Sequence, residues 1–135
     1  MRSWIDHSGE VVWDPSPSLI TGLIEGGQPF WLDIENPTDE VIDQLATSLG
    51  LHPLVVAGSK QFGQGAKLQV YRNGVMLIGF GLDEELHQPV EVHCYYTTGF
   101  LITLRRSPSP AVAALRQAVR CIPSPQATRS GFCIP

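Results

Sequence analysis

The chain of 135 residues carries a formal net charge of −4, and its longest basic run is Arg105-Arg106. This composition argues against nucleic acid or an anionic lipid surface as partner, because both require a basic face. The mean hydropathy is +0.03 and no apolar run approaches about 20 residues, so we expect no insertion into a membrane. The first residues lack the apolar core of a signal peptide, which favours the cytosol. The three cysteines lack CxxC spacing, which favours reduced thiols.

The first third of the chain predicts a strand, a helix and a strand. Residues 10–13 read EVVW and are ended by two prolines, which cannot continue a strand ladder. Residues 19–24 place apolar side chains at helical spacing before the stop at Gly26-Gly27. Residues 29–34, PFWLDI, return to strand character between a glycine pair and an Asn-Pro step.

The segment ENPTDEVIDQLATSLG, residues 35–50, is the clearest helix in the sequence. Asn36 or Thr38 can cap it, Pro37 suits its first turn, and Gly50 suits the position just after its end. Residues 51–59, LHPLVVAGS, predict a second short helix with His52 near its cap.

Two hairpins follow. Asn73-Gly74 predicts a type I′ turn between strands at 67–71 and 75–82, and Thr98-Gly99 separates two β-branched and aromatic runs. Residues 75–80 are apolar on both faces, so we expect helices to cover both sides of the sheet. Together these elements predict an α/β (α+β) fold with two hairpins covered by helices.

The end of the chain changes character after Ser107. Residues 107–120 have serine-proline starts and then an apolar stripe, which predicts a surface helix that packs on the sheet. Residues 121–135 are rich in proline and serine and lack periodicity, which indicates an irregular tail or the start of a linker. We expect residues 1–120 to form one domain.

Few residues form a pattern that carries chemistry. Asp33 and Glu35 share one face of a strand and are weak candidates for a divalent-cation site or an acid pair, with capping and solubility as the structural alternative. Glu91, His93 and Tyr95 also share a face, which we interpret as a solvated polar stripe. The segment GSKQFGQG, residues 58–65, holds loosely spaced glycines but lacks the order of a P-loop.

Three segments, in this order, resemble the N-terminal cytosolic domain of CorA-type magnesium transporters: FWLDIENPTDEVIDQLATSLGLHPL, AKLQVY and EVHCYYTTGFLITLRR. The resemblance covers about residues 29–120. Matches to the family motifs, which we expect to be structural, are Trp31, Asp33, Pro37, Leu51, His52, Pro53 and Lys67.

The resemblance implies a mixed parallel and antiparallel sheet and no enzymatic activity. It implies a homopentameric divalent-cation transporter at the cytoplasmic face of the cell membrane, in which this domain contacts the neighbouring subunits and its own stalk and membrane helices. Those later segments conduct the ion, so we expect this soluble fragment not to transport by itself. The implied cargo is Mg2+, with Co2+ or Zn2+ as alternatives, and no cofactor is expected in the fragment.

The family's regulatory acidic pair follows the L-H-P-L motif, and its two positions here fall on Ala57 and Gly58. Neither side chain has an oxygen that could bind a hard cation, so we interpret this stretch as a connection. Either the ion is sensed elsewhere or the chain belongs to a branch such as the zinc-transporting relatives. Two further hypotheses are a free-standing soluble binding module and a small hydrolase or nucleotide-binding enzyme that uses GSKQFGQG and the Asp33/Glu35 pair.

Overall fold

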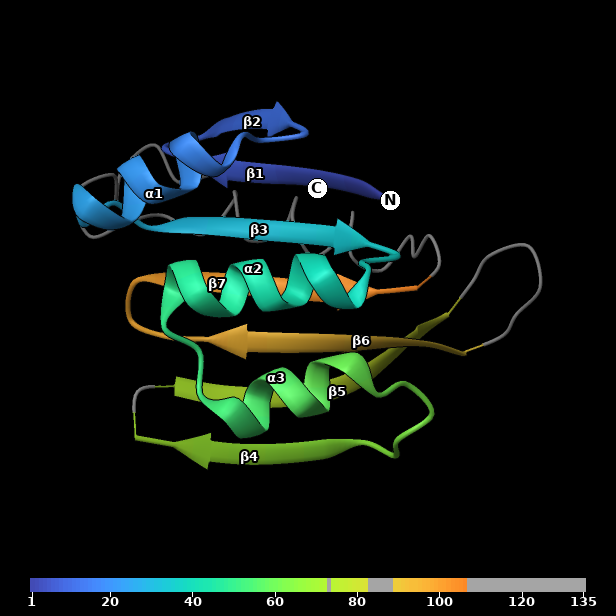
Figure 1. Cartoon of the computed structure of the whole chain (residues 1–135). Helices are drawn as coiled ribbons and strands as arrows, with labels where there is room; N and C mark the ends of the chain where they lie inside the picture. The colour runs from blue at the N-terminus through green and yellow to red at the C-terminus, as the bar shows by residue number, and fades with distance from the viewer. Residues whose placement is uncertain (73, 83–88, 107–135) are drawn as a thin grey trace, which may run out of the picture.

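The computed structural model describes residues 1–72, 74–82 and 89–106, and the side chains of residues 81 and 82 are not among the described ones. In this part of the chain, a seven-stranded sheet carries three helices (Figure 1). In chain order the elements are β1 (Arg2–His7), β2 (Glu10–Trp13), α1 (Pro17–Glu25), β3 (Phe30–Glu35), α2 (Asp39–Leu49), α3 (Pro53–Lys60), β4 (Lys67–Tyr71), β5 (Gly74–Leu82), β6 (Pro89–Tyr96) and β7 (Phe100–Arg105).

The strand order β2-β1-β3-β7-β6-β5-β4 makes the sheet mixed. β3 and β7 run parallel at its centre, and every other neighbouring pair is antiparallel. The mixed sheet and both hairpins are therefore confirmed. Gly74 is the first residue of β5 and pairs with Tyr71, so it belongs to the strand and not to the hairpin turn expected at Asn73-Gly74. Asn73 lies outside the described residues.

One strand is missing from the prediction. β1 contains only two adjacent large apolar residues, Trp4 and Ile5, and both are buried on opposite faces of the sheet. Its turn to β2 is formed by Ser8 and Gly9, which both have positive φ values, 52° and 81°. Serine-glycine is a recognised turn signal, but the residues around it are mostly polar. Apolar periodicity therefore does not predict this hairpin.

The helix ends follow local chemistry. Thr38 caps α2, because its Oγ1 accepts a hydrogen bond from the Val41 N–H at 3.3 Å, and Gly50 ends it with φ 65°. Pro37 precedes this cap, so the expectation that it lies in the first turn is wrong. His52 caps α3, as predicted, and Pro53 lies in the first turn of this helix.

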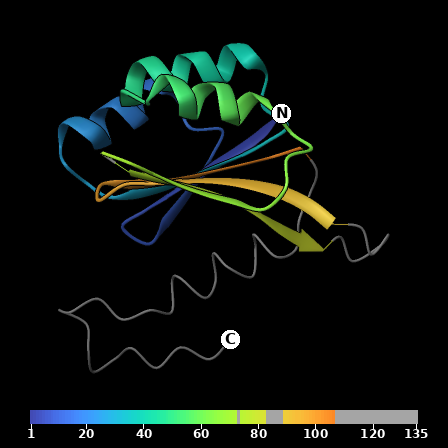
Figure 2. The same ribbon diagram turned by 90° about the horizontal axis from the view of Figure 1, so that it is seen from below.

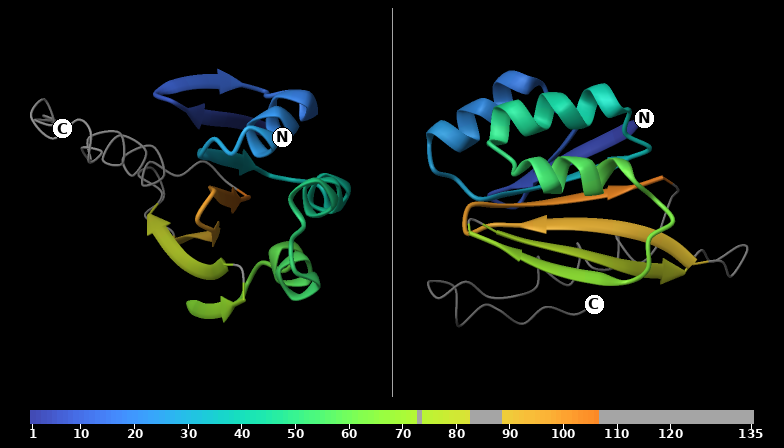
Figure 3. Two further views of the ribbon diagram at one scale, coloured as in Figure 1. Left: turned by 90° about the vertical axis from the view of Figure 1, so that its left-hand side faces the viewer. Right: turned by 60° about the horizontal axis from the view of Figure 1, so that its bottom comes forward.

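All three described helices lie on one face of the sheet (Figures 2 and 3). The main core lies between them and that face, and it is built by buried apolar residues of α1, α2, α3 and the central strands, among them Ile5, Leu32, Val55, Ile78 and Ile102. The expected helical cover of the second face falls on residues 107–120, which lie outside the described residues, as does the predicted tail.

The second face of the sheet has its own small apolar cluster. Trp4 and Trp31 meet edge to face with ring centroids 5.1 Å apart, and Val92 packs with them. Towards the β4 edge this face exposes Leu68, Val70 and Leu77. The two faces of the sheet therefore differ in cover among the described residues.

Candidate functional site

The first half of α3 has a structural role that its sequence suggested. His52 Nδ1 accepts a hydrogen bond from the Leu54 N–H at 3.1 Å, and the imidazole ring lies 5.0 Å from the Tyr71 ring. The nitrogen thus caps the helix, and the ring contacts β4 at Tyr71. This geometry supports the structural interpretation of His52 over a role as a metal ligand or base.

Ala57 and Gly58 lie on the second half of α3. Ala57 is exposed, whereas Gly58 faces the core at Met76, where an added Cβ would lie 3.3 Å from the Met76 Cε. The small size of Gly58 therefore lets α3 approach β5. Neither side chain carries an oxygen, so these two positions do not fit a regulatory magnesium ion held by side chains.

The candidate pair on β3 lies on the second face of the sheet, around an arginine. Asp33 is buried, and its Oδ2 accepts a hydrogen bond from Arg105 at 2.8 Å. Glu35 Oε2 lies 3.8 Å from another nitrogen of the same guanidinium group. The two carboxylates do share a face, as predicted, but the cation between them is Arg105.

The remaining acceptor capacity of Asp33 is also used. Thr103 Oγ1 donates to Asp33 Oδ1 at 2.6 Å, and the Trp31 indole N–H donates to Thr103 Oγ1 at 2.9 Å. A hard cation at this place would have to displace Arg105 and the Thr103 hydroxyl. Sequence reasoning missed Arg105 because it lies 72 residues away, and only the parallel register, which pairs Glu35 with Arg105, reveals it.

A second buried polar pair lies on the helical face. His93 Nε2 lies 2.7 Å from Glu91 Oε2, and the two side chains are 2% and 9% exposed. The shared face of Glu91, His93 and Tyr95 is confirmed, but the interpretation as a solvated stripe is wrong. Phe62 covers the pair, because its ring stacks on the His93 ring at 4.2 Å.

The glycine-rich segment 58–65 contains Phe62 and so covers the buried pair. It does not form an open phosphate-binding loop. Gly63 has φ 89° and donates its N–H to Glu91 Oε2 at 3.1 Å. Lys60 Nζ lies 2.6 Å from Asp43, and this hydrogen bond raises the pKa of Lys60 above its ordinary value. The backbone amide of Gly63 and the lysine charge are thus both engaged within the protein.

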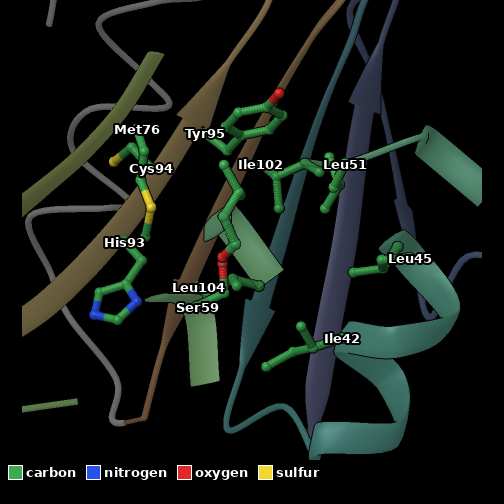
Figure 4. A pocket seen from close by; sticks show the side chains of 11 residues that line it. Ile42, Leu45, Leu51, Ser59, Met76, His93, Cys94, Tyr95, Ile102 and Leu104 are labelled. Atoms are coloured by element: carbon green, nitrogen blue, oxygen red, sulfur yellow. The ribbon is translucent and has the colours of Figure 1, made fainter. Parts of the chain in front are cut away.

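The enclosed space beneath α2 and α3 is small. A cavity of about 10 Å³ is lined by apolar side chains together with Ser59, His93 and Cys94 (Figure 4). This volume admits at most one water molecule. Burial, and then the nearby charge of Asp33, raises the pKa of the Cys94 thiol to about 11, so this cysteine is a weak nucleophile near neutral pH.

Within residues 1–72, 74–82 and 89–106, no three His, Cys, Asp or Glu side chains gather as a metal site would require. None of the helices in the same ranges is long and apolar enough to cross a membrane.

The chain is similar to curated proteins that are named as metal-ion transporters. It is 25% identical over 103 residues to a putative metal ion transporter of Schizosaccharomyces pombe, covering 73% of this chain and 17% of that protein. It is 24% identical over 116 residues to the magnesium transporter ALR1 of Saccharomyces cerevisiae, covering 77% of this chain and 14% of that protein. The chain thus spans less than a fifth of the length of these relatives.

Solved structures share the fold. The full-length CmaX protein superposes with a TM-score of 0.67 at 15% identity, covering 87% of this chain and 38% of that one. The soluble domain of CorA from Methanocaldococcus jannaschii gives 0.62 at 15% identity, with 89% and 46% covered. The ZntB cytoplasmic domain from Vibrio parahaemolyticus gives 0.62 at 17% identity, with 89% and 49% covered.

The family assignment rests on a direct match to the sequence. The family described as CorA-like Mg2+ transporter protein matches residues 26–131, which includes the three segments that carry the resemblance. The match agrees with the fold, because the soluble domain of CorA from Methanocaldococcus jannaschii superposes on the mixed sheet and helices of this chain. The chain therefore belongs to the CorA-like Mg2+ transporter protein family.

Proposed function

We propose that this chain is the cytosolic regulatory part of a homopentameric divalent-cation transporter whose cargo is Mg2+. The observation that carries the proposal is the family match over residues 26–131, and the magnesium transporter ALR1 supports the choice of ion. The described residues contain no metal-ligand cluster, which agrees with a role outside the conducting path. The same family assignment speaks against the hydrolase and nucleotide-binding hypotheses, because the family is one of transporters.

In this proposal the transported ion passes through parts of the protein that the chain does not match in its relatives. The chain covers 17% and 14% of the two curated relatives, which leaves ample length for stalk and membrane segments. The domain then lies at the cytoplasmic face of the cell membrane, in contact with those segments and with neighbouring subunits. Its contribution is to bias the pore between conformational states, which requires contacts that differ between the states.

The structure also bears on how such a domain responds to ions. The side chains of Ala57 and Gly58 offer no oxygen ligand, and Asp33 and Glu35 are engaged by Arg105. We therefore expect the 135-residue chain to bind Mg2+ no more tightly than about micromolar, because oxygen-poor sites hold hard cations weakly. A zinc-transporting relative is the second candidate, since the absence of carboxylates at Ala57 and Gly58 fits a cargo other than Mg2+ equally well.

Calorimetric titration of the chain with Mg2+, Co2+ and Zn2+ tests the regulatory part. The variant Ala57→Glu is the matched control, because residue 57 is exposed and a carboxylate there restores one oxygen ligand without changing the core. We expect weak or no heat with Mg2+ in the original chain. A stoichiometric magnesium site tighter than about micromolar would contradict this expectation.

A growth assay tests the transport part. The complete reading frame that contains this chain is expressed in cells lacking their own magnesium uptake, and growth is measured at limiting Mg2+. Rescue supports the proposal. Rescue of zinc uptake alone would favour the second candidate, and a reading frame without membrane segments would favour a free-standing binding module.

A further inference from the structure

The sheet ends on one side in β4, whose outer edge has no neighbouring strand among the described residues. β4 is the last strand in the sheet order, and no described element lies beyond it (Figure 1). The edge of a sheet presents N–H and C=O groups that its own ladder does not use, and a further strand can pair with them. This edge is therefore a candidate surface for an added strand.

Two residues of β4 turn their backbone groups toward this open edge. Tyr71 and Gly74 pair across a two-residue connection, and a pair that closes so short a turn is joined by direct backbone hydrogen bonds. Hydrogen-bonded and non-hydrogen-bonded pairs alternate along an antiparallel ladder, so Gln69 also bonds to β5. The residues on either side of it, Leu68 and Val70, form the non-hydrogen-bonded pairs, and their N–H and C=O groups therefore point outward.

β4 lacks most of the features that protect an edge strand from pairing. Its ladder with β5 runs over all five of its residues without a bulge, and it contains no proline. Its one charged residue is Lys67, at its first position. The side chains of Leu68 and Val70 lie on the second face of the sheet and are 64% and 77% exposed. An exposed apolar edge of this kind favours the addition of a strand.

We propose that the outer edge of β4 pairs with β4 of a second copy of this chain, antiparallel about a two-fold axis at Gln69. This register places Leu68 opposite Val70 of the second copy, and Val70 opposite Leu68. The residues whose backbone groups point outward then meet each other in hydrogen-bonded pairs. One strand thus provides donors and acceptors in matching positions, as a two-fold contact between identical surfaces requires.

The apolar side chains agree with the same register. Within one chain Leu68 lies opposite Leu77, and Val70 lies opposite Val75. Pairing of Leu68 with Val70 of the second copy joins these two pairs into one apolar row that crosses the contact. Opposed apolar side chains on one face of a sheet stabilise strand pairing.

The register also keeps like charges apart. Lys67 lies opposite Tyr71 of the second copy, so the two Lys67 residues are four positions apart along the pair of strands. At about 3.4 Å per residue this separation is about 14 Å, which exceeds the Debye length of about 8 Å at physiological salt. A two-fold contact cannot close a ring of five subunits, so this contact is separate from the pentamer of the proposed function.

Analytical ultracentrifugation of the 135-residue chain from about 10 µM to about 1 mM tests the contact. A single pair of strands forms a small interface and each chain has a formal charge of −4, so we expect a dimer with a Kd on the order of 100 µM. The variant Val70→Pro removes an outward N–H and leaves the ladder with β5 intact, because an edge strand tolerates proline where the N–H faces solvent. We expect this variant to stay monomeric at about 1 mM.

Val70→Thr is the matched control, because it keeps the N–H and the branched shape of the side chain, and its Kd should rise at most about tenfold. The proposal is overturned if the original chain stays monomeric at about 1 mM, if it forms an assembly other than a dimer, or if Val70→Pro dimerises as well as Val70→Thr. Should Val70→Pro not fold, amide exchange of the original chain decides. The Leu68 and Val70 amides should gain protection between the lowest and highest concentrations, and no gain overturns the proposal. None of these readouts depends on ion transport, so the contact and the proposed function stand or fall separately.

Discussion

Replacing Asp33 with asparagine should cost about 3 kcal/mol of folding stability. Asp33 is 1% exposed, and its charge compensates the guanidinium group of Arg105, which is itself 8% exposed. Removing one partner of a buried ion pair costs roughly 3–5 kcal/mol, because the other charge is left without compensation. Glu35 lies 3.8 Å from Arg105 and keeps part of that compensation, which places the expected cost at the lower end.

Urea unfolding followed by tryptophan fluorescence measures this loss, since Trp31 belongs to the same hydrogen-bond network. Asp14→Asn is the matched control, because Asp14 is exposed and an exposed substitution stays within about 0.5 kcal/mol. The double variant Asp33→Asn with Arg105→Met removes the uncompensated charge and should recover at least about 1 kcal/mol. A single variant within about 1 kcal/mol of the original protein, or a double variant that loses still more, would refute the reasoning.

Gly50→Ala should cost about 1 kcal/mol, because Gly50 has φ 65° and no neighbour within 4 Å of an added Cβ, so the cost is purely conformational. Gly65→Ala, equally open but without a positive φ, should be neutral or slightly stabilising; equal losses in thermal unfolding would contradict this difference. In the folded chain Cys94 should react with iodoacetamide at pH 8 about 100-fold more slowly than in the unfolded chain, because its pKa in the folded chain is about 11. Peptide mass spectrometry measures both rates, and equal rates would show an accessible thiolate. Leu32→Ala should lose about 3 kcal/mol, since Leu32 is 1% exposed in the core, and a loss below about 1 kcal/mol in urea would mean that the core refills the space.

Local chemistry made several elements predictable from the sequence. Thr38 and Gly50 mark the two ends of α2 because capping and a positive φ each demand particular residue types. The hairpin β6–β7 was visible because β-branched and aromatic residues flank a glycine-containing turn. β1 was not visible, because its pairing with β3 depends on contacts across the sheet and only Trp4 and Ile5 carry apolar character.

The candidate site was predictable in part for the same reason. The period of two in a strand correctly placed Asp33 and Glu35 on one face. What decides their chemistry is Arg105, and its position follows from the parallel pairing of β3 with β7, which no local pattern specifies. Likewise the burial of His93 depends on Phe62, which belongs to an irregular segment distant in the sequence.

The geometry of α3 explains why a carboxylate would not fit equally well at positions 57 and 58, to which the sequence resemblance assigns the family's acidic pair. Residue 57 is exposed, so a longer side chain there meets solvent. Residue 58 faces Met76 Cε and Sδ at 3.3 Å and 3.4 Å from an added Cβ, so an acid there needs Met76 to shift and brings a charge toward the core. An oxygen ligand at position 58 would therefore need the space that the close packing of α3 on β5 occupies. In this chain Gly58 allows the close packing.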